Sequence, residues 1–265
     1  MKEETPNEIL EENIEEELDK KPIEKDEKID SKEGEKEISN KIVKNRFEKD
    51  KEEVLNAWVP KTKLGKEVKQ GKVKSIDEIL DNKRKILEPE IVDSLIEVKT
   101  ELISIGQSKG KFGGGKRRAW RQTQRKTQEG NVPTFSALAI AGDENGHIGI
   151  GIGKSKETLP ARDKAIRKAK LNLIKIIRGD GSFDSTGTGN ASIPFKIKGK
   201  SGSVRIVLMP AAPGTGLVVS DEIKKILKLA GIKDIYSKTS GRQRTSFNLI
   251  KACIDALKKT RGDEK

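Results

Sequence analysis

The densest group of side chains that can bind a ligand is a run of cations between residues 109 and 126. The run holds eight basic residues and no acidic one: Lys109, Lys111, Lys116, Arg117, Arg118, Arg121, Arg125 and Lys126. Phe112 and Trp120 are interleaved with them. Guanidinium groups match phosphate geometry, and aromatic rings offer stacking surfaces for unpaired bases. A solvated protein face usually balances its charges, so we interpret this run, including Trp120, as an RNA contact.

Two Gly-Lys-Ser sequences raise the question of nucleotide chemistry. A phosphate-binding loop needs a glycine five positions before the glycine that precedes its lysine. Ile148 holds that position for Gly153-Lys154-Ser155, and Pro194 holds it for Gly199-Lys200-Ser201, so neither sequence is such a loop. Pro213–Gly216 could offer backbone N–H groups to a phosphate, but a tight turn before a helix explains it better. The sequence therefore predicts no enzyme.

Residue counts limit metal, redox and cofactor chemistry. Cys253 is the only cysteine and His147 the only histidine. These counts exclude an intramolecular disulfide and a cysteine-based zinc cluster, and they fit a reducing compartment. We expect Cys253 to be a small core residue. We expect His147 to lie at the surface beside a turn, within reach of RNA, because no nucleophile accompanies it. No catalytic residue, metal site or cofactor is predicted.

The charge of the chain is unevenly distributed. Residues 1–50 carry 18 acidic and 11 basic side chains, a net of −7, which leaves 44 basic and 24 acidic side chains, a net of +20, in the remainder. Such a strongly basic segment favours polyanionic partners, because binding them releases counterions. Nucleic acid is the expected partner, and an anionic membrane is the weaker alternative. No apolar run reaches the roughly 20 residues that span a bilayer, and the acidic N-terminus is not a signal peptide. We therefore expect a cytosolic protein with no membrane partner.

The cationic run leads into a predicted β-hairpin. Residues 134–141 alternate between the two faces of a strand, and Asn145-Gly146 is a strong turn signal because both residues tolerate positive φ. The return strand has isoleucines on one face and bare backbone on the other, formed by Gly149, Gly151 and Gly153. Glycine inside a strand usually marks the close approach of another element. We expect residues 119–127 to form a further strand beside the hairpin.

A basic helix is predicted after the hairpin. Pro160 suits its first turn. The apolar residues at helical spacing predict a buried stripe: Ile166, Ala169, Leu173 and Ile177. Six cations lie off this stripe: Arg162, Lys164, Arg167, Lys168, Lys170 and Lys175. We interpret hairpin and helix as an RNA-binding platform and select Arg162, Arg167 and Lys168 as RNA contacts.

Composition divides the chain into five segments. Residues 1–53 are highly charged and poor in apolar side chains, so we expect a disordered charged tail. Residues 54–97 form an extension with two short helices, one that starts at Ser75 with a capping box to Glu78 and one near 88–96. Residues 98–178 form a first domain, the glycine-rich residues 179–191 a connector, and residues 192–265 a second α/β domain.

The second domain has its own turn and cap signals. Two strands flank the turn at residues 199–202, and Ser220 is a plausible N-cap of a helix that ends at Gly231. Residues 232–236 are expected to form a strand. A last helix has an apolar face: Phe247, Ile250, Cys253, Ile254 and Leu257.

Five motifs, in this order, resemble the family of the universal small-subunit ribosomal protein five: GDENGHIGIGIGKSKE, AIRKAKLNLI, GSVRIVLMPAAPGTGL, LAGIKDIYSKTSG and KACIDALKKT. The likeness covers about residues 97–260. The extension before it resembles that of the archaeal and eukaryotic branch of the family, and the size of the protein favours archaea. The resemblance implies an α+β protein of two small α/β domains. The first is a double-stranded-RNA-binding-like βββα unit, a three-stranded antiparallel sheet against one helix. The second is a ββαβα unit with a four-stranded sheet.

The resemblance also implies a function. Proteins of this family are structural constituents of the small ribosomal subunit in the cytoplasm and act on no small-molecule substrate. They bind small-subunit rRNA, help form the messenger RNA entry channel, contact the neighbouring ribosomal proteins four and eight, and support decoding accuracy. The RNA-facing positions that the family implies are the cations of the 109–126 run, Lys154, Lys156, Arg242 and Arg244.

Two other functions make different predictions. A free double-stranded-RNA-binding factor would lack the second domain, which residues 192–265 supply. A nucleotide-dependent enzyme would need a complete phosphate loop and acidic metal ligands, and the sequence contains neither pattern.

Overall fold

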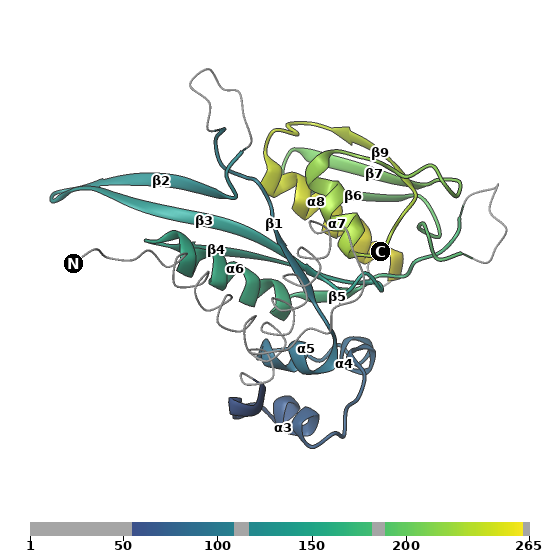
Figure 1. The fold of residues 1–265 in the computed structure, drawn as a ribbon. Coiled ribbons are helices and arrows are strands. Elements are labelled where there is room, and N and C mark those ends of the chain that lie inside the picture. Colours follow the sequence, from purple (N-terminus) through teal and green to yellow (C-terminus); the bar gives the residue numbers. More distant parts are fainter. Residues whose placement is uncertain (1–54, 109–116, 182–188, 262–265) are drawn as a thin grey trace, which may run out of the picture. The chain divides into compact units, whose positions relative to one another are not determined.

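The computed structural model describes residues 55–108, 117–181 and 189–261 (Figure 1). The chain divides into two compact units, Met1–Asn56 and Ala57–Lys265. The described part of the first unit is Leu55 and Asn56, which are helical. The predicted disordered tail lies outside the described residues, as do three predicted RNA contacts, Lys109, Lys111 and Lys116. The sections below concern the second unit.

The predicted βββα arrangement is confirmed in the first domain. Strands β2 (Trp120–Thr127), β3 (Gly130–Gly142) and β4 (His147–Ser155) pair antiparallel, and helix α6 (Thr158–Leu171) packs against them. Two further strands were not expected. Strand β1 (Lys99–Leu102) pairs with β3, and β5 (Leu173–Lys175) pairs with β4, so the sheet has five strands.

Small side chains let α6 lie directly on this sheet. Across β3 and β4 the register pairs alanines with glycines: Ala137 with Gly153, Ala139 with Gly151, and Ala141 with Gly149. A Cβ on Gly151 would lie 2.1 Å from the Ala165 carbonyl oxygen, and one on Gly153 would lie 2.0 Å from the Ala161 oxygen. The expected close approach at the glycine face is therefore confirmed, and the approaching element is the backbone of α6 (Figure 1).

The predicted apolar stripe of α6 is correct only at Ala169. The helix buries Ala161, Ala165 and Ala169, while Ile166 is only half-buried. It ends at Leu171, so Leu173 lies in β5, and Ile177 is 45% exposed. A helix that touches bare strand backbone has no room for larger side chains at the contact. Apolar periodicity alone therefore missed Ala161 and Ala165 and carried the helix too far.

The turn between β3 and β4 is confirmed, although a different residue supports it. Positive φ occurs at Glu144 (62°) and Gly146 (104°), and Asn145 does not adopt it. The Asp143 carboxylate accepts hydrogen bonds from the backbone N–H of Asn145 at 2.8 Å and of His147 at 3.0 Å. This side-chain turn closes the loop and places Glu144 in the left-handed region.

The second domain has the predicted ββαβα order with one addition, a two-residue strand before its first helix. Its four-stranded sheet has the spatial order β6 (Ile197–Ser201), β7 (Val204–Pro210), β9 (Ile235–Ser240) and β8 (Leu217–Val218), with β8 parallel to β9. Helix α7 (Asp221–Leu229) starts after its N-cap, Ser220. Helix α8 (Ser246–Lys258) packs on β6 and β7 and is followed by the 3₁₀ turn η1 (Lys259–Arg261). The strand expected at residues 232–236 lies at 235–240, because Gly231, with φ of 77°, still belongs to the turn after α7.

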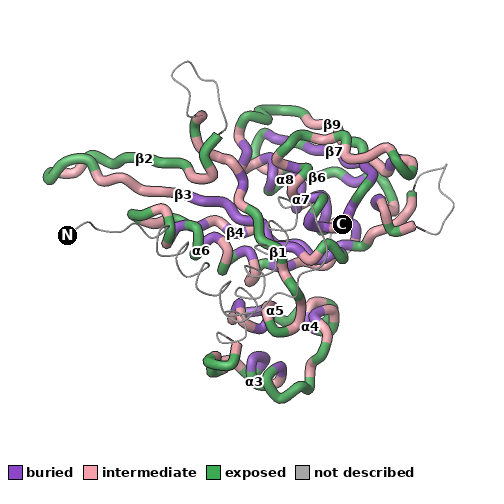
Figure 2. Tube along the Cα trace, viewed as in Figure 1, coloured by how far each residue is buried: buried purple, intermediate pink, exposed green. Residues whose placement is uncertain are grey.

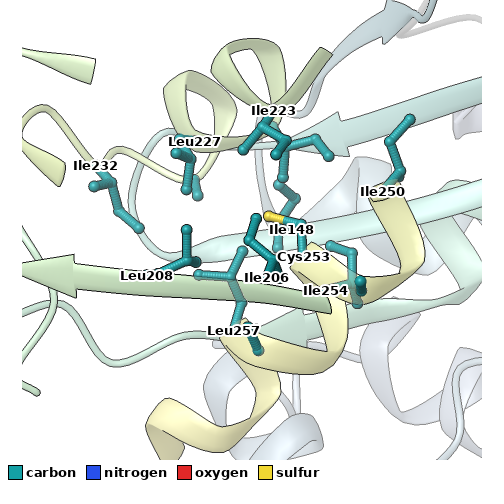
Figure 3. Packing of buried hydrophobic residues seen from close by; sticks show 14 of the residues in the cluster. Ile148, Ile206, Leu208, Ile223, Leu227, Ile232, Ile250, Cys253, Ile254 and Leu257 are labelled. Atoms are coloured by element: carbon teal, nitrogen blue, oxygen red, sulfur yellow. The ribbon is translucent and has the colours of Figure 1, made fainter. Parts of the chain in front are cut away.

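One core joins the two domains. Ile206, Leu208, Ile223 and Cys253 pack together in the second domain, and Ile148 from β4 lies among them (Figure 3). Leu138 and Ile140 from β3 belong to the same cluster. The face of the first sheet that α6 does not cover is therefore buried, along part of its length, against the second domain.

The extension folds into three short helices that pack on the body. These are α3 (Lys63–Lys69), which was not predicted, α4 (Ile76–Asp81) and α5 (Glu90–Leu95). Ile79, Ile91 and Val92 are buried in a cluster that includes Leu173 from β5. Ser75 is the N-cap of α4 as expected, but its side chain makes no capping hydrogen bond, so the predicted capping box is wrong.

Candidate nucleic-acid interface

Strand alternation separates the cations of β2 onto two faces. Arg121 and Arg125 share one face, and Trp120 and Lys126 share the other, because successive side chains of a strand point to opposite sides. Trp120 lies opposite Ala137, on the face that α6 covers further along the sheet. The basic run is therefore not one patch, and no reading of charge density alone could have divided it.

The register adds Lys154 to the Arg121 face. Ser136 of β3 lies opposite Arg121 of β2 on one side and opposite Lys154 of β4 on the other. All three belong to one row across the sheet, and both cations are exposed. Figure 2 shows the change in burial along these strands: β2 is mostly exposed, and β3 passes from exposed near the β2–β3 turn to buried further along.

The uncovered end of this face meets the second domain at a hollow of about 600 Å³. Arg117 and Arg121 line it from the first domain, and Arg244 lines it from the loop between β9 and α8. The structure thus brings together predicted contacts that lie more than 120 positions apart in the sequence. We call the set Arg117, Arg121, Arg125, Lys154 and Arg244 the sheet surface.

Most charges of the sheet surface are unneutralised. Arg117 is paired with Glu222 at the start of α7, with Nη1 and Oε1 3.6 Å apart. Among the described residues, the other four cations have no ion-pair partner. Exposed, unpaired guanidinium and ammonium groups on one face are free to neutralise phosphates.

The three predicted contacts on α6 lie elsewhere. Arg162, Arg167 and Lys168 are exposed on a helix that covers the opposite face of the sheet, so they do not join the sheet surface. Arg167 lies 3.7 Å from Glu90 of the extension, in a pair that is mostly solvated. The predicted cations therefore form two separate surfaces.

The remaining predicted contacts border the sheet surface or stand apart from it. Arg118, Trp120 and Arg121 line a second hollow of about 450 Å³. Trp120 is half-buried there, so its stacking on a base stays a prediction. Lys126, Lys156 and Arg242 are exposed, near the tip of the β2–β3 ribbon, after β4 and after β9, respectively.

Sequence reasoning placed His147 wrongly. It is 7% exposed, not at the surface, and both ring nitrogens are engaged. Nδ1 lies 2.6 Å from Oδ2 of Asp143, and Nε2 lies 3.1 Å from Oδ1 of Asp77 in α4. Burial disfavours the charged ring, but the hydrogen bonds to Asp143 and Asp77 outweigh it and raise the pKa of His147 above its usual 6.5. Because each ring nitrogen faces a carboxylate oxygen, the geometry favours the protonated ring, and His147 joins the extension to the hairpin turn.

The ion pairs around His147 extend to the C-terminus. Lys175 of β5 lies 2.9 Å from Asp77 and 3.1 Å from Asp81, and Arg261 lies 3.1 Å from Asp81. A hydrogen bond from Lys175 is the main cause that lowers the pKa of Asp77. These contacts link α4, β5 and η1. Their role is structural, since neither nitrogen of His147 is left to accept a proton from a substrate.

The described part of the chain contains neither a metal site nor a membrane-spanning helix. There, no group of three His, Cys, Asp or Glu side chains is arranged to hold a metal ion. None of the described helices has the length and apolar character to cross a membrane.

Comparison with known proteins gave consistent matches. The family model "Ribosomal protein S5, N-terminal domain" matches residues 119–177, and "Ribosomal protein S5, C-terminal domain" matches residues 199–265. The chain is 49% identical over 206 residues to the small ribosomal subunit protein uS5 of Nanoarchaeum equitans, which covers 77% of this chain and 88% of that protein. It is 42% identical over 210 residues to uS5 of Hyperthermus butylicus, and this match covers 78% of this chain and 92% of that protein. It is 43% identical over 204 residues to uS5 of Thermofilum pendens, and this match covers 77% of this chain and 94% of that protein.

Proposed function

The chain belongs to the small ribosomal subunit protein uS5 family, and from this premise we propose that it binds small-subunit rRNA through the sheet surface. The resemblance inferred from its motifs is confirmed. As a member of this family the protein is a structural constituent of the small subunit of the cytoplasmic ribosome and not an enzyme. Its relatives named above are archaeal.

The observation that carries the proposal is the row of Arg121 and Lys154 beside Arg244. These cations come from two strands and from a loop of the other domain. Arg121 and Arg244 line one hollow, and Lys154 lies in the same row of the sheet as Arg121, on the other side of Ser136. Rigid placement matters because cations that are already held in position lose little conformational entropy when they bind a phosphate. Phosphate neutralisation at this position would fasten both domains to one stretch of rRNA.

Binding of the purified chain to small-subunit rRNA at several salt concentrations tests the proposal. The triple variant Arg121→Ala/Lys154→Ala/Arg244→Ala should lower the slope of log affinity against log salt by about 2, since each lost phosphate contact removes roughly 0.7–0.9. The matched control removes three exposed lysines from α3 and α8, Lys63→Ala/Lys251→Ala/Lys258→Ala, and should retain most of the slope. Equal losses in the two variants would mean that net charge, not the sheet surface, determines binding.

Sedimentation separates this proposal from the alternative of a free double-stranded-RNA-binding factor. We expect the protein to travel with small subunits in a gradient and to remain there after a high-salt wash. A protein that stays at the top of the gradient would favour the free factor, although residues 192–261 already contain the second domain that such a factor would lack.

The finer functional proposals follow from the family. We propose that the protein helps form the messenger RNA entry channel, supports decoding accuracy, and contacts the neighbouring small-subunit proteins four and eight. Cross-linking within purified small subunits would identify the neighbours. A translational misreading assay on subunits that carry the sheet-surface triple variant would test the decoding role.

The domain boundaries are also a proposal. We place the connector at residues 179–191, between domains at 98–178 and 192–265, with residues 54–97 as the extension. Gly179 and Ser192 support this division because their backbones hydrogen-bond to each other, N–H to carbonyl, at 3.0 Å in both directions. The two ends of the connector are thereby held together.

A further inference from the structure

A groove runs between the two domains on the side of α6 and α7. One part, about 610 Å³, lies between Glu101 of β1, Arg162 of α6 and Lys224 of α7. A second part, about 1000 Å³, shares Glu101, Lys224 and Lys228 with the first and continues to Lys233. The two hollows adjoin at these shared residues, and we call them together the α6–α7 groove.

Six cations line the α6–α7 groove. Lys225 is paired with Glu101 and Arg178 donates to backbone carbonyls, but the other four have no partner in the described part of the protein. Arg162, Lys224, Lys228 and Lys233 are exposed, and in the described ranges no ion pair or hydrogen bond to their side chains is present. Lys224 and Lys228 lie one helical turn apart, where like charges destabilise a helix. An uncompensated pair of this kind is not explained by the stability of α7, whereas an anionic ligand would neutralise it.

The acids that border the groove are already engaged. Glu101 lies 3.8 Å from Lys225, Glu144 lies 3.0 Å from Lys99, and Asp143 holds His147. None is left to neutralise Lys224, Lys228 or Lys233. The groove therefore keeps an excess of positive charge along its length.

From these observations we infer that the α6–α7 groove binds the phosphodiester backbone of small-subunit rRNA. A strand of RNA carries negative charge at regular intervals, which matches cations spaced along an open channel. This inference rests on the proposed rRNA binding and adds a second contact on another side of the molecule. Arg162 belongs to the first domain and the three lysines to the second, so one RNA segment in the groove would fix the two domains to each other.

The test compares three variants of the full chain in rRNA binding at several salt concentrations. The groove variant is Lys224→Ala/Lys228→Ala/Lys233→Ala, and the others are the sheet-surface and control triples described above. We expect the groove variant to lower the salt slope by about 2, as the sheet-surface variant does, with little change in the control. All three groove lysines are exposed, so an unchanged urea midpoint will show that the variant folds.

The outcomes distinguish the inference from the proposed function. A groove variant that binds like the control, while the sheet-surface variant is impaired, overturns the groove and leaves the proposed function in place. Failure of the unmodified chain to bind rRNA overturns both. Loss in the groove variant alone supports the groove and contradicts the role given to the sheet surface.

A second measurement locates the RNA. The only native cysteine, Cys253, is fully buried, so a Lys228→Cys variant carries a single accessible thiol for a tethered iron chelate. Hydroxyl radicals generated there should cleave small-subunit rRNA at a discrete site, and a Lys251→Cys variant on the exposed side of α8 provides the comparison. Cleavage no stronger from position 228 than from free chelate would overturn the inference.

Discussion

Substitution of Gly151 by alanine tests the packing on which the first domain depends. Gly151 lies under α6, and a Cβ at this position would be 2.1 Å from the Ala165 carbonyl oxygen and 2.3 Å from the Ala169 backbone nitrogen. Ordinary contact begins near 3.4 Å, so the strand and the helix must separate by about 1.3 Å. Both nearest groups are backbone atoms, so no side-chain rotation can relieve the overlap.

The expected cost follows from that displacement. A gap of 0.5–1 Å already forfeits about a quarter to a half of each dispersion contact, and the alanines of α6 and β3 would all lose contacts together. Overpacked cores typically lose about 1–3 kcal/mol, and the reduced freedom of the unfolded chain returns about 0.4–1 kcal/mol. We therefore expect the Gly151→Ala variant to be less stable by about 1–2 kcal/mol.

Urea unfolding followed by circular dichroism measures this loss as a lower midpoint. Gly189→Ala is the matched control, because its φ is ordinary and the nearest atom to an added Cβ is 3.5 Å away. A second variant, Gly151→Ala/Ala165→Gly, should give no rescue, since the obstructing atom is a carbonyl oxygen and not the Ala165 methyl. A Gly151→Ala midpoint equal to that of the control would refute the close strand–helix contact.

Three further predictions concern the extension and the core. The pKa of His147 is raised in the folded state, so the stability that this residue contributes to the fold is complete below pH 6.5 and is lost as the pH rises through the folded pKa. The urea midpoint should therefore fall toward pH 9, and this pH dependence should be reduced in a His147→Gln variant. Glu88 accepts hydrogen bonds from the Trp58 indole at 3.1 Å and from the backbone N–H groups of Lys61 and Thr62, so Glu88→Ala should cost about 2 kcal/mol and shift Trp58 emission to the red. Burial raises the pKa of Cys253 to about 12, and a thiol reagent at pH 8 should modify it only at the rate of unfolding.

Local patterns in the sequence were sufficient for most of the fold. The glycine face of β4 predicted a close approach, and α6 makes it, because only a strand without side chains admits another backbone. Turn signals also located the β3–β4 and β6–β7 hairpins. The errors arose where tertiary packing overrode periodicity: the α6 stripe consists of alanines that carry little hydrophobic signal, and β1 and β5 are too short to be recognised before their partners are known.

The candidate interface shows a different limit. Charge density identified Arg117, Arg121 and Arg125, and the family resemblance implied Lys154 and Arg244. Strand alternation could have divided Arg121 and Arg125 from Lys126 once β2 was predicted. The neighbourhood of Arg244 could not be predicted this way, because it depends on how the second domain covers one end of the first sheet. The groove lysines were missed for the opposite reason. Lys224 and Lys228 lie in an amphipathic helix, where cations opposite the core are ordinary, and only the position of β1 beside them turns that face into a groove.

His147 shows why residue types alone could not establish the role of a site. A lone histidine next to a turn is usually exposed, and its neighbours in sequence include just one of its two partners, Asp143. The other, Asp77, is 70 positions away in the extension. That contact requires α4 to dock beside β5, which in turn depends on Leu173 lying in a strand and not in the predicted helix. A single error about where α6 ends therefore hid the docking surface of the extension, and with it the reason that this histidine is charged and buried.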